Sequence, residues 1–168
     1  IRDRDRGATV APNEEIVTLT ETGVRRQSYR ETRDRAHQLA HALAGIGIKV
    51  GDRVGTFMWN GSRHLEAYHA VAGMGAVLHT LNVRLSPKDL EYIINHAEDQ
   101  IIIVDADVLP LLEVLNDKIP TVRKIIVATE DGFEGWSTGL PDPVDYEAFI
   151  NGQPTHYECC LLYTSPSP

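Results

Sequence analysis

Residues 101–104, Ile-Ile-Ile-Val, constrain the fold more than any other part of this sequence. A β-branched run that is apolar on both faces is typical of a strand whose sheet is covered by helices on both sides. Residues 125–128, Ile-Ile-Val-Ala, repeat the pattern. Both runs are far shorter than the ~18 apolar residues that span a bilayer. They therefore predict buried strands, and the sequence predicts no transmembrane helix.

Strand-like segments alternate with amphipathic helices along most of the chain. Further strands are expected at residues 53–58 and 76–81, and shorter helices at 108–115 and 146–150. This alternation favours right-handed crossovers and a parallel sheet. Before it, residues 16–20 and 24–28 are strand-like, and the glycine between them permits a tight turn. The expected fold is α/β, with an N-terminal β-hairpin followed by a mainly parallel sheet that has helices on both faces.

Three longer helices have recognisable starts. Ser28 and Glu31 have the spacing of a capping box. Ser86 is the expected N-cap of another helix, because the proline after it is favoured at the first helical position. The middle helix is expected to start at a cap on Asn60 or Ser62. This helix is expected to carry Leu65, Tyr68, Val71 and Ala72 on one face, and the helix after Ser86 is expected to bury Leu90, Ile93, Ile94 and Ala97. Residues 132–143 are expected to form a loop.

The charge and the cysteines exclude several classes of protein. The chain has 16 Lys+Arg and 24 Asp+Glu, a formal net charge of −8 and a pI near 5.3. That balance disfavours a nucleic-acid surface, because phosphates would be repelled. Cys159 and Cys160 are adjacent, which is neither a zinc spacing nor a disulfide framework, so a reducing, cytoplasmic setting is the default.

A hydrolase is one alternative. Residues 135–139, Gly-Trp-Ser-Thr-Gly, match the nucleophile elbow of α/β-hydrolases, and Asp142 or Asp145 with His156 follow in triad order. An elbow needs a helix directly after its serine, and the prolines at 141 and 143 disfavour one. We therefore expect that Ser137 is not a nucleophile.

The histidines of the sequence predict no metal site, and its glycines predict no nucleotide-binding motif. His37 and His41 are four apart on a helix but lack a third ligand at metal spacing, so solvent-edge positions are expected for both. Flanking or satisfied core positions are expected for His64, His69 and His79. Gly73 and Gly75 lack the third glycine of a dinucleotide-binding motif, and no Gly-Lys-Ser/Thr loop is present. The residues alone predict an α/β layer without a complete active site.

Three segments, residues 51–54, 63–82 and 84–98, together resemble the N-terminal part of AMP-forming acyl-CoA synthetases, most of all the long- and medium-chain fatty-acid–CoA ligases. The resemblance runs from about Val17 to Ser165 and covers roughly the first third of such an enzyme. It implies a ligase that uses ATP with Mg²⁺ to convert a fatty acid into an acyl-adenylate, whose AMP is then displaced by coenzyme A. It allows a homodimer and a location peripheral to the membrane.

The sequence departs from the family pattern inside the phosphate-binding loop, where the family has Tyr-Thr-Ser-Gly-Thr-Thr-Gly. Tyr163, Thr164 and Ser165 begin that pattern, but residues 166–168, Pro-Ser-Pro, stand in place of the glycines. Proline offers no N–H and fixes φ, so it cannot replace glycine around a phosphate. Thr164 and Ser165 are the only nucleotide-binding residues that the resemblance assigns; it assigns no catalytic and no metal-binding residue.

The expected organisation has three parts. These are a charged lead-in at 1–15, the N-terminal α/β part of the large domain at 16–158, and the start of the phosphate-loop region at 159–168, for which a non-native tail is the alternative. The expected function is that of part of a fatty-acid–CoA ligase, inactive alone and binding neither ATP, Mg²⁺ nor coenzyme A tightly. A stand-alone flavodoxin-like binding module is the alternative.

Overall fold

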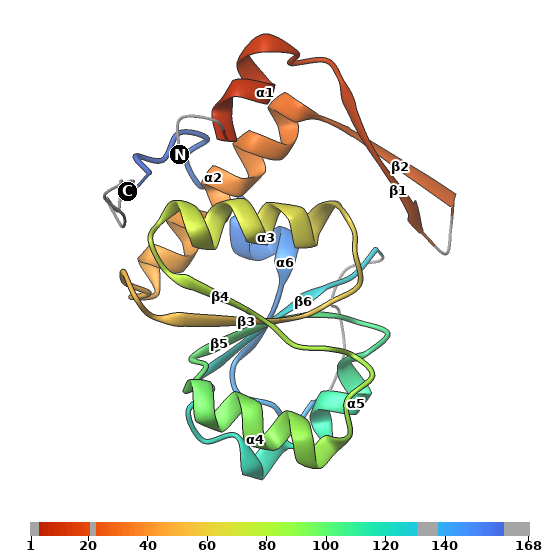
Figure 1. The fold of residues 1–168 in the computed structure, drawn as a ribbon, viewed down its shortest axis with the longest axis vertical. Coiled ribbons are helices and arrows are strands. Elements are labelled where there is room, and N and C mark those ends of the chain that lie inside the picture. The colour runs from red at the N-terminus through yellow and green to blue at the C-terminus, as the bar shows by residue number, and fades with distance from the viewer. Residues whose placement is uncertain (1–3, 21–22, 131–137, 160–168) are drawn as a thin grey trace, which may run out of the picture.

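The computed structural model describes residues 4–20, 23–130 and 138–159, which form a β-hairpin beside a three-layer α/β unit (Figure 1). The helices are α1 (Arg4–Val10), α2 (Tyr29–Gly45), α3 (Ser62–Gly73), α4 (Pro87–Ala97), α5 (Leu109–Glu113) and α6 (Tyr146–Ile150), with a 3₁₀ turn at Asn116–Lys118. The strands are β1 (Glu15–Thr20), β2 (Gly23–Ser28), β3 (Arg53–Phe57), β4 (Val77–Thr80), β5 (Ile101–Asp105), β6 (Lys124–Ala128) and β7 (Pro143–Asp145). Among these ranges, no helix is long and apolar enough to cross a bilayer.

One five-stranded sheet forms the centre, in the order β4-β3-β5-β6-β7, and every neighbouring pair is parallel. The predicted parallel arrangement of the strands near 53–58, 76–81, 101–104 and 125–128 is confirmed. β7 was not expected, because residues 132–143 were predicted as loop. Its first residue, Pro143, pairs with Ile125 at the edge of the sheet, where a proline without an N–H is tolerated.

Helices cover both faces of the sheet, α2, α3 and α6 on one and α4 and α5 on the other (Figure 1). The side chains of β5 alternate between the two cores. Ile101 and Ile103 belong to the core under α2 and α3, whereas Ile102 and Val104 belong to the core over α4 and α5. All four are fully buried, which explains why this strand has no polar face.

The helix starts follow the expectation at two of three positions. Ser28 accepts a hydrogen bond from the third helical residue of α2 in a complete capping box, and Ser86 caps α4. The N-cap of α3 is instead Gly61, which makes no side-chain hydrogen bond, so the assignment of the cap to Asn60 or Ser62 is wrong. The stripe expected on α4 is present, with Leu90 and Ile94 buried and Ile93 and Ala97 half-buried.

The buried face of α3 also differs from the expectation. Tyr68 is 47% exposed and Ala72 is exposed, whereas Arg63, His64 and Glu66 are buried. Counting apolar residues at helical spacing could not find this face, because the partners of its polar groups come from other elements.

The hairpin was expected, but α1 was not. β1 and β2 pair antiparallel with Leu19 opposite Val24. Residues 4–10, part of the charged lead-in, form α1, which packs against α2 with Ala8 buried. A Cβ at Gly7 would lie 3.2 Å from the Tyr29 ring, so α1 approaches the start of α2 closely at a glycine.

Candidate functional site at the carboxyl ends of the strands

A cleft of about 630 Å³ opens at the edge of the sheet where β3, β5 and β6 end. The hairpin stands beside this edge (Figure 1) and supplies the opposite wall. The lining comes from the hairpin (Thr18, Leu19, Thr20, Arg25), the start of α3 (Gly61, Ser62, Arg63, His64) and the strand ends (Met58, Trp59, Asn60, Asp105, Ala106, Asp107, Ala128, Thr129, Glu130). Ligands of open parallel sheets bind at the carboxyl ends of the strands. The position therefore makes this cleft the candidate functional site.

Trp59, which follows β3, is fixed by Asp105, the last residue of β5, and by Asp107, which follows that strand. Its backbone N–H donates to Asp105 Oδ2 at 2.7 Å, and its indole Nε1–H donates to Asp107 Oδ2 at 2.7 Å. The side chain remains 48% exposed. A fixed, half-exposed indole on the cleft can pack against an apolar or flat group of a ligand.

Asp105 is the titratable group of the cleft with the most altered environment. Burial raises the pKa of Asp105 to about 6, the N–H of Trp59 opposes this, and the charge of Asp107 adds to it. Its carboxyl group therefore changes charge close to neutral pH rather than near pH 4. Asp105 can hold or release a proton at the end of the central strand.

Glu130, at the end of β6, joins the hairpin to α3. Its Oε2 accepts from Arg25 at 2.9 Å, and its Oε1 accepts from Arg63 at 2.8 Å. Arg63 is 8% exposed, whereas the side chain of Glu130 is 38% exposed, so water reaches this ion pair from the Glu130 side only. The pair fixes the hairpin wall relative to the strand ends, which gives the cleft a defined width.

The ion pairs continue under α2 and α6 through Glu147. Arg63 Nε donates to Glu147 at 3.0 Å, and Arg35 binds the same carboxylate through two nitrogens at 2.7 and 2.9 Å. Burial alone would raise the pKa of Glu147, but Arg35 and Arg63 hold it below its usual range. Glu147 is therefore a permanent anion between two guanidinium groups.

Glu66 of α3 ends this network in the interior. It is fully buried and accepts from Gln27 Nε2 at 2.7 Å, from Arg35 Nε at 2.8 Å and from the Tyr146 hydroxyl at 2.7 Å. Burial and the charge of Glu66 raise the pKa of Tyr146, so its hydroxyl stays a donor. The whole network thus pairs three carboxylates with three guanidinium groups, which explains how α3 can bury a polar face. Its members are Glu66, Glu130 and Glu147 with Arg25, Arg35 and Arg63.

The free groups of the cleft decide what it can bind. Glu130 is paired with Arg25 and Arg63, so Asp105 and Asp107, which hold Trp59, are the other charged groups of the lining. These two carboxylates disfavour a triphosphate beside them. Across the described ranges, no group of three or more His, Cys, Asp or Glu side chains could hold a metal ion. The cleft is suited to an uncharged or apolar group that packs against Trp59.

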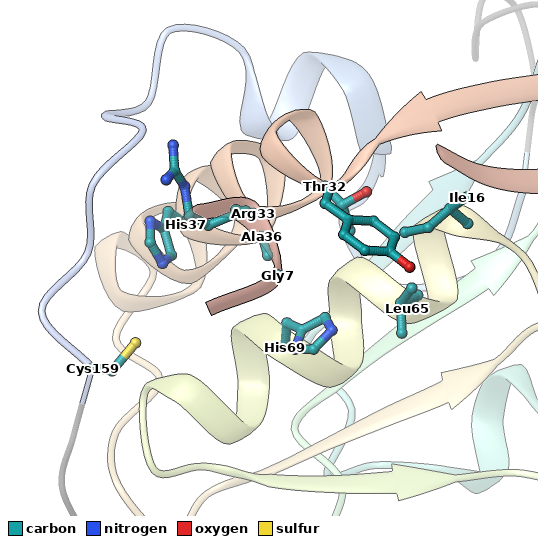
Figure 2. A pocket seen from close by; sticks show the side chains of 11 residues that line it. Gly7, Ile16, Thr32, Arg33, Ala36, His37, Leu65, His69 and Cys159 are labelled. Atoms are coloured by element: carbon teal, nitrogen blue, oxygen red, sulfur yellow. The ribbon is translucent and has the colours of Figure 1, made fainter. Parts of the chain in front are cut away.

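A second hollow, of about 410 Å³, lies between α1, α2 and α3 (Figure 2). Figure 2 shows Thr32 and Ala36 of α2 and Leu65 and His69 of α3 around it, with Gly7 of α1 between them. Its lining is mainly apolar. It holds no cluster of charged groups comparable with that of the cleft.

The residues predicted from the loop motifs fall partly outside the described ranges. Thr164, Ser165 and Ser137 lie there, so their roles stay predictions. The two carboxylates of the hydrolase alternative are described and are engaged elsewhere. Asp145 Oδ1 caps α6 by accepting from Ala148 N at 2.9 Å, and Asp142 pairs with the ammonium group of Lys124.

The histidines occupy positions that the sequence only partly indicated. His37 is 7% exposed, so its assignment to a solvent edge is wrong; it bonds a backbone carbonyl of the segment after α6, as does the half-buried His41. His64 Nε2 lies 3.0 Å from the Thr56 hydroxyl, and burial lowers the pKa of His64. It is an interior histidine, as expected, but its buried Nδ1 has no hydrogen-bond partner among the described residues.

The cleft residues were missed, although a signal was present. Trp59, Asp105 and Glu130 each follow a strand that the sequence did predict, by no more than two residues. Because carboxyl ends of parallel strands meet at one edge, these positions could have been named together. The pairs among them, such as Trp59 with Asp105, could not.

Comparison with known proteins identifies the family. The sequence model of the AMP-binding enzyme family matches residues 5–167. The chain is 42% identical over 96% of its length to the long-chain-fatty-acid–CoA ligase of Thermus thermophilus and 40% identical over 92% to the 3-methylmercaptopropionyl-CoA ligase of Ruegeria lacuscaerulensis. It is 35% identical over 85% to the medium-chain-fatty-acid–CoA ligase of Ectopseudomonas oleovorans. The chain spans 30%, 29% and 26% of these relatives.

Solved structures agree with this result. The anthranilate CoA ligase AuaEII in complex with anthranoyl-AMP matches 94% of the chain with a TM-score of 0.81 at 25% identity, and 28% of that ligase is covered. Coronafacic acid ligase from Pectobacterium brasiliense matches with a TM-score of 0.80 at 21% identity, covering 95% of the chain and 30% of that ligase, which shows the shared fold. The chain belongs to the family of AMP-binding enzymes. These relatives give no support to a stand-alone flavodoxin-like module.

Proposed function

We propose that this chain is the N-terminal α/β part of a fatty-acid–CoA ligase. The observation that carries the proposal is its 42% identity, over 96% of its length, to a long-chain-fatty-acid–CoA ligase. In the proposed reaction the carboxylate of the acid attacks the α-phosphate of ATP and releases pyrophosphate. The thiol of coenzyme A then attacks the acyl carbon of the adenylate, and AMP leaves as the thioester forms.

We propose that the residues lining the cleft at the strand ends form part of the substrate-binding region in the longer ligase to which this chain is proposed to belong. The support is its place at the carboxyl edge of the sheet and the fixed indole of Trp59. Its carboxylates do not suit ATP phosphates, and no described side-chain cluster suits Mg²⁺. We therefore assign neither ATP nor Mg²⁺ to this cleft.

Phosphate binding is proposed to require residues outside the described ranges. Thr164 and Ser165 stay predictions for this role, as does the assignment of residues 159–168 to the start of the phosphate-loop region. We infer that the 168-residue chain alone forms no acyl-adenylate, because stabilising charge at the α-phosphate needs the donors of the family's phosphate-binding loop, and residues 163–165 match only the beginning of that loop. A cytoplasmic or membrane-peripheral location and a homodimer also stay predictions.

The acid substrate can be tested directly in the longer ligase of which this chain is proposed to be a part, called the parent ligase below. The purified enzyme is incubated with ATP, Mg²⁺, coenzyme A and one acid at a time, from butyrate, octanoate, palmitate and 3-(methylthio)propionate, and thioesters are quantified by mass spectrometry. We expect palmitoyl- or octanoyl-CoA to form fastest. Preference for 3-(methylthio)propionate would move the assignment within the family, and no thioester from any acid would contradict the proposal.

A further inference from the structure

Three side chains of α2 bond to the backbone of the segment that follows α6. His37 Nδ1 lies 3.0 Å from the carbonyl oxygen of residue 155, Gln38 Nε2 donates to that of residue 153 at 3.2 Å, and His41 Nε2 lies 2.7 Å from that of residue 156. The three bonds span 115 to 118 residues of sequence. In Figure 1 this segment runs from α6 alongside α2.

Ring contacts hold the same segment from its side chains. The ring of His156 meets that of His37 edge-on, with centroids 6.0 Å apart, and the ring of Tyr157 meets that of His41 edge-on at 4.8 Å. Residues 153–157 are therefore fixed through both backbone and side chains.

These bonds hold a segment that lies outside any helix or strand. Residues 153–159 form neither helix nor strand, so their carbonyls have no ladder partners. Because a carbonyl only accepts, His37 must carry hydrogen on Nδ1 and His41 on Nε2. The sheet and all buried members of both cores lie before residue 151, and Tyr157, which is half-buried, is the described residue of the segment that packs against a core.

We propose that His37, Gln38 and His41 form a carbonyl clasp, a positioning site on α2 that fixes the path of residues 153–157. In the ligase of the proposed function, on which this role in catalysis rests, the clasp sets the point from which the polypeptide continues toward the rest of the enzyme. None of the three side chains lines the cleft at the strand ends, so they act through the segment that they hold.

Isosteric variants separate the lost hydrogen bond from the lost ring. Asn can place its amide N–H near the position of His Nδ1, and Gln near that of His Nε2. H37L/H41L removes both donors, whereas H37N/H41Q keeps them. His96→Leu on α4 is the control, because His96 is exposed and stacks on Tyr92 away from the clasp.

The first readout uses the 168-residue chain and backbone ¹⁵N relaxation. We expect order parameters of residues 153–157 to fall from about 0.85 to below about 0.6 in H37L/H41L, with β5 unchanged, and to stay high in H37N/H41Q and His96→Leu. In the unsubstituted chain, ¹⁵N shifts should show the Nδ1–H tautomer for His37 and the Nε2–H tautomer for His41. Unchanged order parameters in H37L/H41L, or the opposite tautomers, would overturn the clasp.

The second readout uses the parent ligase. In H37L/H41L we expect kcat for adenylation to fall at least about tenfold with KM for the fatty acid unchanged, and H37N/H41Q to restore it, because small displacements of positioned groups have effects of this size. Equal impairment of both double variants would contradict the positioning role. Inactivity of the unsubstituted ligase with every acid would instead contradict the proposed function, while the relaxation result would stand.

Discussion

The hydroxyl of Tyr146 donates a hydrogen bond of 2.7 Å to Glu66 Oε2, joining α6 to α3 across 80 residues of sequence. Both side chains are fully buried. Glu66 also accepts from Arg35 and Gln27, so four elements, β2, α2, α3 and α6, meet at one carboxylate. This carboxylate organises the layer above the sheet, and its removal has consequences that can be measured.

Glu66→Ala should lower the free energy of unfolding by about 2–5 kcal/mol, because the buried Tyr146 hydroxyl and Gln27 amide would lose their acceptor while Arg35 would keep only Glu147. Urea denaturation of the variant and the unsubstituted chain measures the difference. Glu14→Ala, at an exposed glutamate, is the matched control and should change stability by less than about 0.5 kcal/mol. Equal effects of the two substitutions would show that Glu66 does not organise this layer.

Gly55→Ala should destabilise the chain by about 1–3 kcal/mol through overpacking. A Cβ at Gly55 would lie 3.2 Å from Ile102 Cγ1 and 3.4 Å from Asp99 Oδ2, and Asp99 is buried against His79. Gly45→Ala is the control, because nothing lies within 4 Å of its Cβ position and alanine favours the last turn of α2. Chemical denaturation should rank Gly55→Ala well below Gly45→Ala, and the reverse order would refute the packing described for β3.

Asp105→Asn should change how stability depends on pH. The pKa of Asp105 is about 6 in the folded chain against 3.8 as its ordinary value, so folding disfavours the charged form. The unsubstituted chain therefore loses stability as pH rises from about 4 to about 6, and the full loss persists above that range. The variant should match it near pH 4 and exceed it by about 1–3 kcal/mol near pH 8. Parallel melting curves across this range would contradict the shifted pKa.

Ser137 should not react as a nucleophile. Asp145 and Asp142, the carboxylates of the hydrolase alternative, are engaged with α6 and Lys124. A fluorophosphonate probe should label the chain no more than it labels Ser137→Ala. Stoichiometric labelling that disappears in Ser137→Ala would revive the hydrolase.

Local sequence signals predicted the layers of the fold well. The run at 101–104 is buried on both faces, and Ser28 with Glu31 forms the expected capping box, because both signals depend on residues close in sequence. α1 escaped prediction because only Ala8 of its described side chains is buried, so no apolar stripe marks it.

Non-local pairing explains what the sequence could not predict. The buried face of α3 depends on Arg35 and Tyr146, which approach Glu66 only after the chain has folded. The same holds for the cleft, where Trp59 meets Asp105 across 46 residues. The strand ends could be located from the sequence, but the contacts between them could not.

Fatty-acid-dependent exchange of labelled pyrophosphate into ATP tests the central claim most directly, because it reports acyl-adenylate formation without coenzyme A. The parent ligase and the 168-residue chain are assayed side by side with Mg²⁺ and a series of fatty acids. The account predicts exchange by the parent ligase that requires the fatty acid, and none by the 168-residue chain. Exchange by the 168-residue chain, or its absence from the parent ligase with every acid, would contradict it.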